Sequence, residues 1–164
     1  MTKRLTRMGL LTALALIIFT IEAQIPPLVP IPGVKLGLAN IITVYSMFCL
    51  GPKDTFKILI CRIILGSFFA GHMMVLFYSL AGGILCFLVM IPMSKIVTRK
   101  QIWVCSVIGA VAHNIGQIII AILIAGTPSL ILYLPVLLIS GTIAGFFTGL
   151  CAQFVVNRLG NQNL

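Results

Sequence analysis

The chain has 164 residues, of which 60% are hydrophobic and only 8% are charged, and its formal net charge is +9. Soluble domains carry about 25% charged residues, so this composition excludes a soluble globular protein and makes lipid the solvent for most of the exterior. The basic residues stand in small groups between apolar runs, not along one face with interleaved aromatic residues, which argues against nucleic-acid binding.

Apolar runs bounded by proline, glycine and charge predict an all-α integral membrane protein with one transmembrane domain, residues 1–164, and six spans. The expected spans are residues 8–25, 34–50, 54–70, 72–94, 102–125 and 129–157. The second and third spans are close to the lower length limit for crossing a bilayer. The basic N-terminus imitates a signal peptide, but the first run is long enough to cross and five more follow, which favours a retained first helix.

The orientation follows from the positions of the basic residues. With the N-terminus inside, nine of the eleven lie on the cytoplasmic side, Lys35 lies outside and Arg62 lies within a span. The nine are Lys3, Arg4, Arg7, Lys53, Lys57, Lys95, Arg99, Lys100 and Arg158. The positive-inside rule therefore predicts that both termini are cytoplasmic.

Two spans carry small residues at four-residue spacing. Gly141, Gly145 and Gly149 form one face of the sixth span, where a second helix can approach closely. Packing within the same chain and dimerisation are both open explanations for that face. Gly9 and Ala13 form a weaker pair near the cytoplasmic end of the first span.

Polar side chains on five spans fall in one slab, from the membrane midplane toward the outside. Arg62 lies near the midplane of the third span, and His113 and Gln117 share a face of the fifth. Ionisable residues inside a membrane are costly and usually mark a function. The slab predicts an outward-facing binding site lined by Glu22, Lys35, Asn40, Arg62, Tyr78, His113, Asn114 and Gln117.

A structural explanation of the same slab stays open. In it, Arg62 pairs with Glu22 and the amide side chains fix the helices to one another. The proline-rich segment at residues 26–33 lies over the same outer mouth, where it would serve either as a lid or as a stiff connector.

No catalytic motif is visible. The two carboxylates, Glu22 and Asp54, are expected at opposite membrane faces and cannot form an acid/base pair. The chain has no Walker loop, no HExxH and no GxSxG. We therefore expect neither enzymatic activity nor a metal or nucleotide cofactor.

Four segments carry a resemblance to a known family. They are PGVKLGLANI at residues 32–41, RIILGS at 62–67, YSLAGG at 78–83 and GAVAHNIGQ at 109–117. Together they resemble the bacterial Gx transporter family, also described as heptaprenyl diphosphate synthase component I, over about residues 6–156. The resemblance places the chain in the bacterial cytoplasmic membrane as a multi-pass protein.

That family is similar to the substrate-binding S components of energy-coupling-factor transporters. The resemblance implies a six-helix bundle, both termini inside, a pocket toward the outer face and an external loop that helps to close it. It also implies that Gly9 and Ala13 dock on a coupling protein, with Gly9 standing where the superfamily usually has alanine. A membrane T protein and ATPases would then be partners.

Two functions remain in competition. The first is a membrane subunit that binds a small solute for uptake or transfer, related to a vitamin, a flavin or an isoprenoid. Arg62 and Lys35 would favour negative charge or carbonyl groups in that ligand. The alternative is a non-catalytic scaffold or accessory subunit, partnered with a prenyl diphosphate or quinone synthase or with a flavoprotein of extracellular electron transfer. Prenyl diphosphate synthases need aspartate-rich motifs, and this chain has a single aspartate, Asp54.

Overall fold

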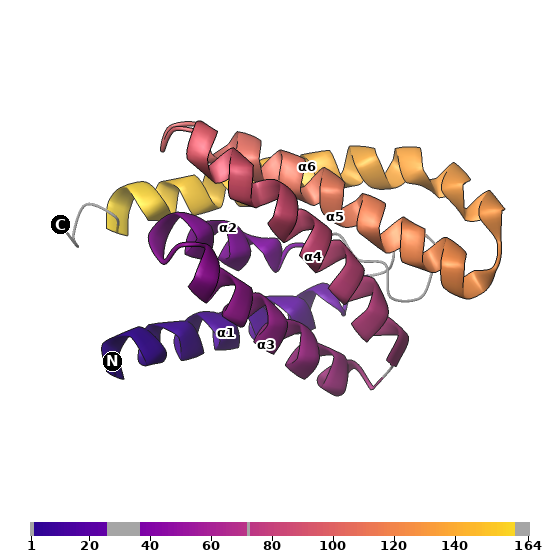
Figure 1. Ribbon diagram of the computed structural model, residues 1–164, viewed down its shortest axis with the longest axis horizontal. Helices are drawn as coiled ribbons and strands as arrows, with labels where there is room; N and C mark the ends of the chain where they lie inside the picture. The colour runs from indigo at the N-terminus through magenta and orange to yellow at the C-terminus, as the bar shows by residue number, and fades with distance from the viewer. Residues whose placement is uncertain (1, 26–36, 72, 160–164) are drawn as a thin grey trace.

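The computed structural model describes residues 2–25, 37–71 and 73–159, and every regular element in that part of the chain is a helix. Figure 1 shows these elements packed as one bundle. They are α1 (Thr2–Glu22), α2 (Asn40–Cys49), α3 (Pro52–Ala70), α4 (Met73–Ile96), α5 (Ile102–Ala125), a 3-10 helix η1 (Pro128–Tyr133) and α6 (Leu134–Leu159).

Four helical stretches among the described residues are long and apolar enough to cross a membrane. They are α1, α4, α5 and the continuous stretch Pro128–Arg158, which joins η1 to α6. The helix α3 has 19 residues but carries four charged side chains, so it is not a uniformly apolar span. The chain is therefore a multi-pass helical membrane protein.

The second expected span differs from the structure. Its helix, α2, begins at Asn40, well after residue 34, and has ten residues. At 1.5 Å per residue it is about 15 Å long, half of the roughly 30 Å hydrocarbon core. Gly37 has a φ of 79°, in the left-handed region, and its carbonyl accepts a hydrogen bond from the Asn40 amide at 2.9 Å. The chain makes a turn at Gly37, which sequence hydrophobicity alone does not reveal.

The bounds of the other helices differ less from the expected spans. The fifth span has the expected bounds, and α4 ends two residues later than expected, at Ile96. The helix α1 already begins at Thr2, so it includes the basic residues at its start. The last span begins with η1, because Pro128 starts a tighter helical turn before α6 continues.

The helix α5 packs closely along both α4 and α6 (Figure 1). A Cβ atom on Gly149 would lie 2.6 Å from the Cα atom of Trp103, and one on Gly145 would lie 3.0 Å from the Cα atom of Val107. Both contacts are with α5 of the same chain. The small-residue face of α6 therefore serves packing within the chain, one of the two explanations that the sequence left open.

The start of α1, the α2–α3 connection, the α4–α5 connection and the end of α6 lie at one end of the bundle (Figure 1). These four segments hold the nine basic residues that the sequence analysis assigned to one side of the membrane. We call this end the basic end. Its composition is what the positive-inside rule expects of one membrane face.

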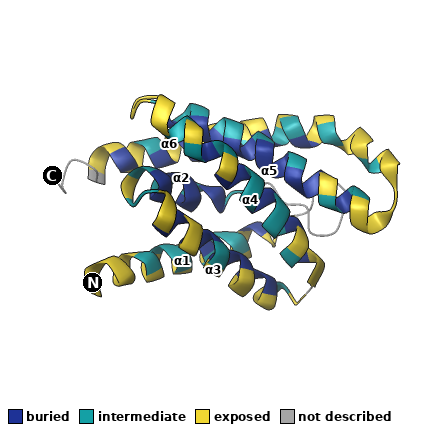
Figure 2. Ribbon diagram, viewed as in Figure 1, coloured by how far each residue is buried: buried dark blue, intermediate teal, exposed yellow. Residues whose placement is uncertain are grey.

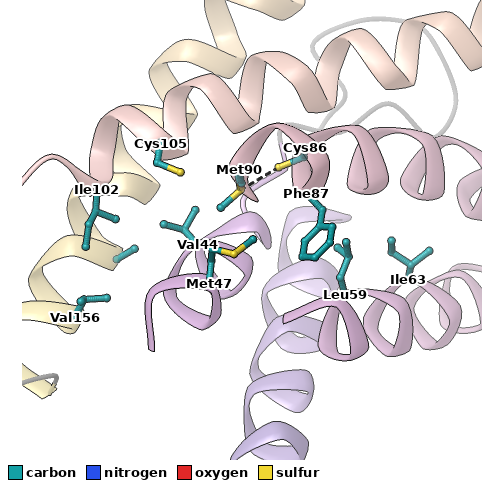
Figure 3. Packing of buried hydrophobic residues seen from close by; sticks show 11 residues of the cluster. Val44, Met47, Leu59, Ile63, Cys86, Phe87, Met90, Ile102, Cys105 and Val156 are labelled. Carbon is teal, nitrogen blue, oxygen red and sulfur yellow. Dashed lines mark hydrogen bonds between the residues drawn. The ribbon is translucent and has the colours of Figure 1, made fainter. Parts of the chain in front are cut away.

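Figure 2 shows exposed residues on the outer faces of the bundle and buried residues along α2 and α5. Many of the exposed residues are large and hydrophobic. Phe68, Leu123 and Leu132 are 82%, 71% and 75% exposed. Such residues face lipid in a membrane protein. The largest internal cluster lies toward the basic end and includes Val44, Met47, Phe87, Met90 and Ile102 (Figure 3).

Candidate functional site

A small internal cavity lies where α1, α3, α4 and α5 meet the turn before α2. The space open to the centre of a water molecule in it is about 20 Å³, enough for about one water. Its lining consists of Phe19, Glu22, Gly37, Ala39, Arg62, Ile63, Ser79, His113 and Gln117. Four of the eight residues predicted from the sequence are among these.

Arg62 is the buried cation of this cavity. Its side chain extends from the middle of α3, where only 6% of its surface is exposed. Its Nη2 donates a hydrogen bond to Oδ1 of Asn40 at 3.4 Å, which is long for such a bond. Its Nε has no hydrogen-bond partner among the described residues. The guanidinium therefore retains donor capacity, and the attraction of Glu22 partly compensates its charge.

Glu22, at the end of α1, closes the cavity on one side. Its Oε1 accepts a hydrogen bond from the Gly37 backbone nitrogen at 2.5 Å. Only 4% of the Glu22 surface is exposed, so a carboxylate is buried at the cavity that Arg62 also lines. This arrangement brings one negative and one positive side chain to the same cavity.

His113 and Gln117 line the opposite wall from α5. A Cβ atom on Gly82 of α4 would lie 2.8 Å from Nδ1 of His113, so glycine at that position lets the imidazole pack closely against α4. A Cβ atom on Gly37 would lie 3.4 Å from Cδ2 of the same ring, so the turn before α2 also packs against His113. Oε1 of Gln117 has no partner within the described structure, although its residue is 1% exposed.

Asn114 and Tyr78 are both buried but do not line the cavity. Nδ2 of Asn114 donates a hydrogen bond to the Leu137 carbonyl of α6 at 2.5 Å. Tyr78 belongs to an apolar cluster with Ile118, Ala121 and Leu137. Asn114 therefore fixes α5 to α6, which is the role that the structural explanation gave to the amides, and the slab divides into a cavity and a helix contact.

Two expectations concern segments that the structure does not describe. Lys35 and the candidate lid at residues 26–33 lie outside the described residues. Gly9 and Ala13 are described, and they line an open apolar groove between α1 and α3, together with Met8, Thr12 and Leu65. A Cβ atom on Gly9 would meet nothing within 4 Å, so this small-residue pair is not used for packing within the described chain.

Sequence analysis missed several cavity residues. Ser79 lies on α4 three residues before Gly82, and this spacing puts both on the face toward α5. This spacing indicates that Ser79, not Tyr78, is the residue of α4 that faces the cavity. Phe19 lies three residues before Glu22 on α1, and the same spacing applies. Gly37 and Ala39 enter the cavity through the turn, which only the backbone shows.

The second carboxylate, Asp54, lies at the basic end, as expected from its position in the sequence. It is 2% exposed and accepts two hydrogen bonds from Arg4, at 2.6 Å from Nε and 2.8 Å from Nη2. This bidentate pair joins the start of α1 to the start of α3. The described carboxylates thus occupy two separate environments, and neither adjoins the other.

Comparison with known proteins gives a family but no relative of known structure. No curated protein and no solved structure matches the chain. A family model described as heptaprenyl diphosphate synthase component I matches residues 11–155, most of the chain and all of the cavity residues. This chain therefore belongs to the heptaprenyl diphosphate synthase component I family, as a helical membrane protein.

Proposed function

We propose that the protein is a membrane-embedded binding subunit that takes up or transfers a small solute through the cavity around Arg62. The observation that carries the proposal is the set of buried polar atoms there that the described chain leaves unsatisfied. They are Nε of Arg62 and Oε1 of Gln117, whose residues line the cavity, and Nδ2 of Asn40, whose side chain is hydrogen-bonded to Arg62. A buried polar atom without a partner costs about 1–3 kcal/mol, so three neighbouring ones favour a ligand over simple helix packing.

The chemistry of these atoms indicates the kind of ligand. Arg62 offers hydrogen-bond donors, and Gln117 offers an unsatisfied acceptor oxygen. A ligand with a carbonyl or carboxylate next to an N–H or O–H group would meet both. Glu22 adds a carboxylate to the cavity that Arg62 lines, which favours carbonyl-rich compounds with little net charge over strongly anionic ones. Flavin-like and other vitamin-like rings fit this description.

The cavity must widen to hold such a ligand, because about 20 Å³ accepts one water and small-molecule sites are about 300–1,000 Å³. The helix that can move at least cost is α1. Only Ala15 and Glu22 of its described residues are buried. Displacing α1 would remove Phe19 and Glu22 from the cavity wall.

The resemblance to S components of energy-coupling-factor transporters extends this proposal. In that arrangement the protein has six spans and cytoplasmic termini in a bacterial cytoplasmic membrane, performs no catalysis and carries no cofactor. A T protein and ATPases would supply the energy. The open groove at Gly9 and Ala13 supports docking of such a partner, because small residues there let another helix approach closely.

The family description favours a second candidate, a non-catalytic partner of a prenyl diphosphate synthase. A quinone synthase or an electron-transfer flavoprotein is an alternative partner in the same role. The bond from Asn114 to α6 and the small size of the cavity are compatible with such a scaffold. Purification under mild conditions distinguishes the two. A transport subunit is expected with a membrane partner and ATPases, and a scaffold with a soluble synthase or flavoprotein.

The direct test is thermal unfolding of the purified protein with a panel of vitamins, flavins and isoprenoids. A ligand at 100 times its Kd stabilises a protein by about 2.7 kcal/mol, which is readily detected. We expect Arg62→Gln and Gln117→Leu each to lower the affinity at least about tenfold, since each removes a buried hydrogen bond to the ligand.

Gln153→Leu is the matched control. Oε1 of Gln153 is also buried without a partner in the described chain, but Gln153 does not line the cavity. This variant should keep the full ligand response. The proposal is wrong if no compound of the panel stabilises the protein, or if Gln153→Leu removes the response as completely as Gln117→Leu.

A further inference from the structure

A second, larger hollow opens at the basic end, between α3 and α4. It has a volume of about 480 Å³ and is lined by Arg4, Pro52, Lys53, Phe56, Lys57, Phe87 and Ile91. We call it the basic groove. Its α3 residues all precede Arg62 in the sequence. It shares α1, α3 and α4 with the cavity but none of the lining residues.

The floor of the basic groove is apolar. The rings of Phe56 and Phe87 lie 5.4 Å apart between centroids, and Ile91 is one turn further along α4. Phe87 also contacts the internal cluster and lies beside Leu59 of α3 (Figure 3), so the floor is fixed by the core. In a bilayer such a surface is covered by hydrocarbon, and the acyl chain of a lipid has the right chemistry and shape.

The rim of the groove is cationic. Lys53 and Lys57 are both exposed and stand one turn apart on α3. The charge of Arg4 is balanced by Asp54, to which it is bonded through two nitrogens. The positive charge of Arg4 and the negative charge of Asp54 cancel. Lys53 and Lys57 therefore leave a net charge of +2 at the rim. A ligand that fills the floor would therefore place its head beside two uncompensated cations.

We propose that the basic groove is a binding site for an anionic phospholipid. Its acyl chain lies over Phe56, Phe87 and Ile91, and its phosphate accepts hydrogen bonds from Lys53 and Lys57. The position at the basic end supports this assignment, because the headgroup layer of the membrane lies at the level of the helix ends. Some lipid must cover the apolar floor in any case, and the two lysines select which headgroup it carries.

The test uses tryptophan fluorescence and brominated lipids. Trp103 is the chain's one tryptophan and does not line the groove, so Trp103→Phe provides a silent background. Phe56→Trp then places a reporter on the groove floor. In phosphatidylcholine bilayers, dibrominated phosphatidylglycerol should quench this reporter at a mole fraction at least about fivefold lower than dibrominated phosphatidylcholine does, since each lysine near a headgroup contributes about that factor.

Two matched double variants remove the same amount of charge. Lys53→Ala with Lys57→Ala should bring the two lipids to equal quenching, whereas Lys95→Ala with Lys100→Ala, exposed at the same end but outside the groove, should keep the preference. Raising the salt concentration should weaken the preference in the parent protein.

Equal quenching by the two lipids in the parent protein would overturn the proposal. So would a preference lost equally in both double variants, because the charge of the whole basic end would then suffice. Displacement of the brominated phosphatidylglycerol by micromolar farnesyl diphosphate would also overturn it, since the occupant would then be a prenyl diphosphate.

Discussion

The Glu22 carboxylate and the Gly37 backbone nitrogen are joined by a 2.5 Å hydrogen bond that spans 15 positions of the chain. The bond holds the end of α1 against the turn before α2, and both residues line the cavity. Because Glu22 lines the same cavity as Arg62, the bond sets the position of the carboxylate at the site of the buried guanidinium. The charge of the site and the closure of α1 are therefore coupled.

Glu22→Gln tests this coupling. The neutral amide still accepts a hydrogen bond from Gly37 but makes a weaker one, so we expect a loss of about 1 kcal/mol in stability, seen as a lower melting temperature. It also removes the negative charge from the cavity that Arg62 lines. Under the proposed function, the affinity for negatively charged ligands should rise relative to neutral ones.

The measurement is a titration of one anionic and one neutral ligand of similar size against both proteins. Gln24→Glu is a useful control, because it places a carboxylate two residues further on, at an exposed position outside the cavity. An unchanged ratio of the two affinities in Glu22→Gln would mean that Glu22 does not set the charge of the site.

Gly37→Ala should destabilise the protein and impair the cavity. At a φ of 79° an alanine costs about 1–2 kcal/mol relative to glycine. Its Cβ atom would also lie 3.1 Å from Nδ2 of Asn40, so the Asn40 side chain, which is bonded to Arg62, would have to shift slightly. We expect a melting temperature several degrees lower than that of the parent protein.

Gly9→Ala is the control for Gly37→Ala, since Gly9 is helical and a Cβ atom there meets nothing within 4 Å. Alanine favours a helix over glycine by up to about 1 kcal/mol, so this variant should be as stable as the parent or slightly more so. Equal melting temperatures for Gly37→Ala and the parent would contradict the conformation described for Gly37.

Asn114 and Gly141 should behave as a coupled pair in a double-mutant cycle. A Cβ atom on Gly141 would overlap Nδ2 of Asn114 and so break its bond to the Leu137 carbonyl. Each single alanine variant is expected to lose about 1–3 kcal/mol of stability. In the double variant the smaller side chain at 114 makes room for the methyl group at 141, so the combined loss should be smaller than the sum.

The cycle is measured by thermal or denaturant unfolding of the four proteins in one detergent. Gly126→Ala, at a turn where a Cβ atom has no neighbour within 4 Å, serves to show the cost of backbone strain without a clash. Additive losses for the pair would show that Asn114 and Gly141 do not touch.

The all-helical fold and the apolar exterior were predictable, because hydrophobicity and the spacing of charges determine both. The bounds of α5 followed from composition alone, since a charged connection precedes it and Gly126 ends it. The short α2 was not predictable in this way. Its start depends on the left-handed conformation of Gly37, and glycine in a sequence does not say which conformation it adopts.

The position of the cavity was predictable in outline, but which side chains line it was not. Membrane depth, counted along each helix, placed Glu22, Arg62 and His113 at similar heights, and the structure brings them to one cavity. Depth does not give the direction of a side chain around its helix. Asn114 lies one residue from His113, about 100° around α5, and this rotation points it to α6 instead.

Removing Arg4 and removing Asp54 should lower the melting temperature by different amounts. Asp54 is 2% exposed, whereas the side chain of Arg4 is 66% exposed. Arg4→Gln leaves a buried carboxylate without its cation and should lower the melting temperature clearly. Asp54→Asn leaves an arginine that can turn to water or headgroups, so it should have a smaller effect. Arg4→Gln combined with Asp54→Asn should recover most of the loss of Arg4→Gln.

Thermal unfolding of the three variants in one detergent measures this order. Arg7→Gln is the control for removing a cation from the start of α1, since Asp54 is bonded to Arg4 through both of its oxygens. Equal losses for Arg4→Gln and Asp54→Asn would mean that water reaches the carboxylate. Water would then screen the carboxylate, and the charge of Arg4 would add to that of the two lysines at the basic groove. The preference of the groove for an anionic lipid should in that case survive the loss of either lysine alone.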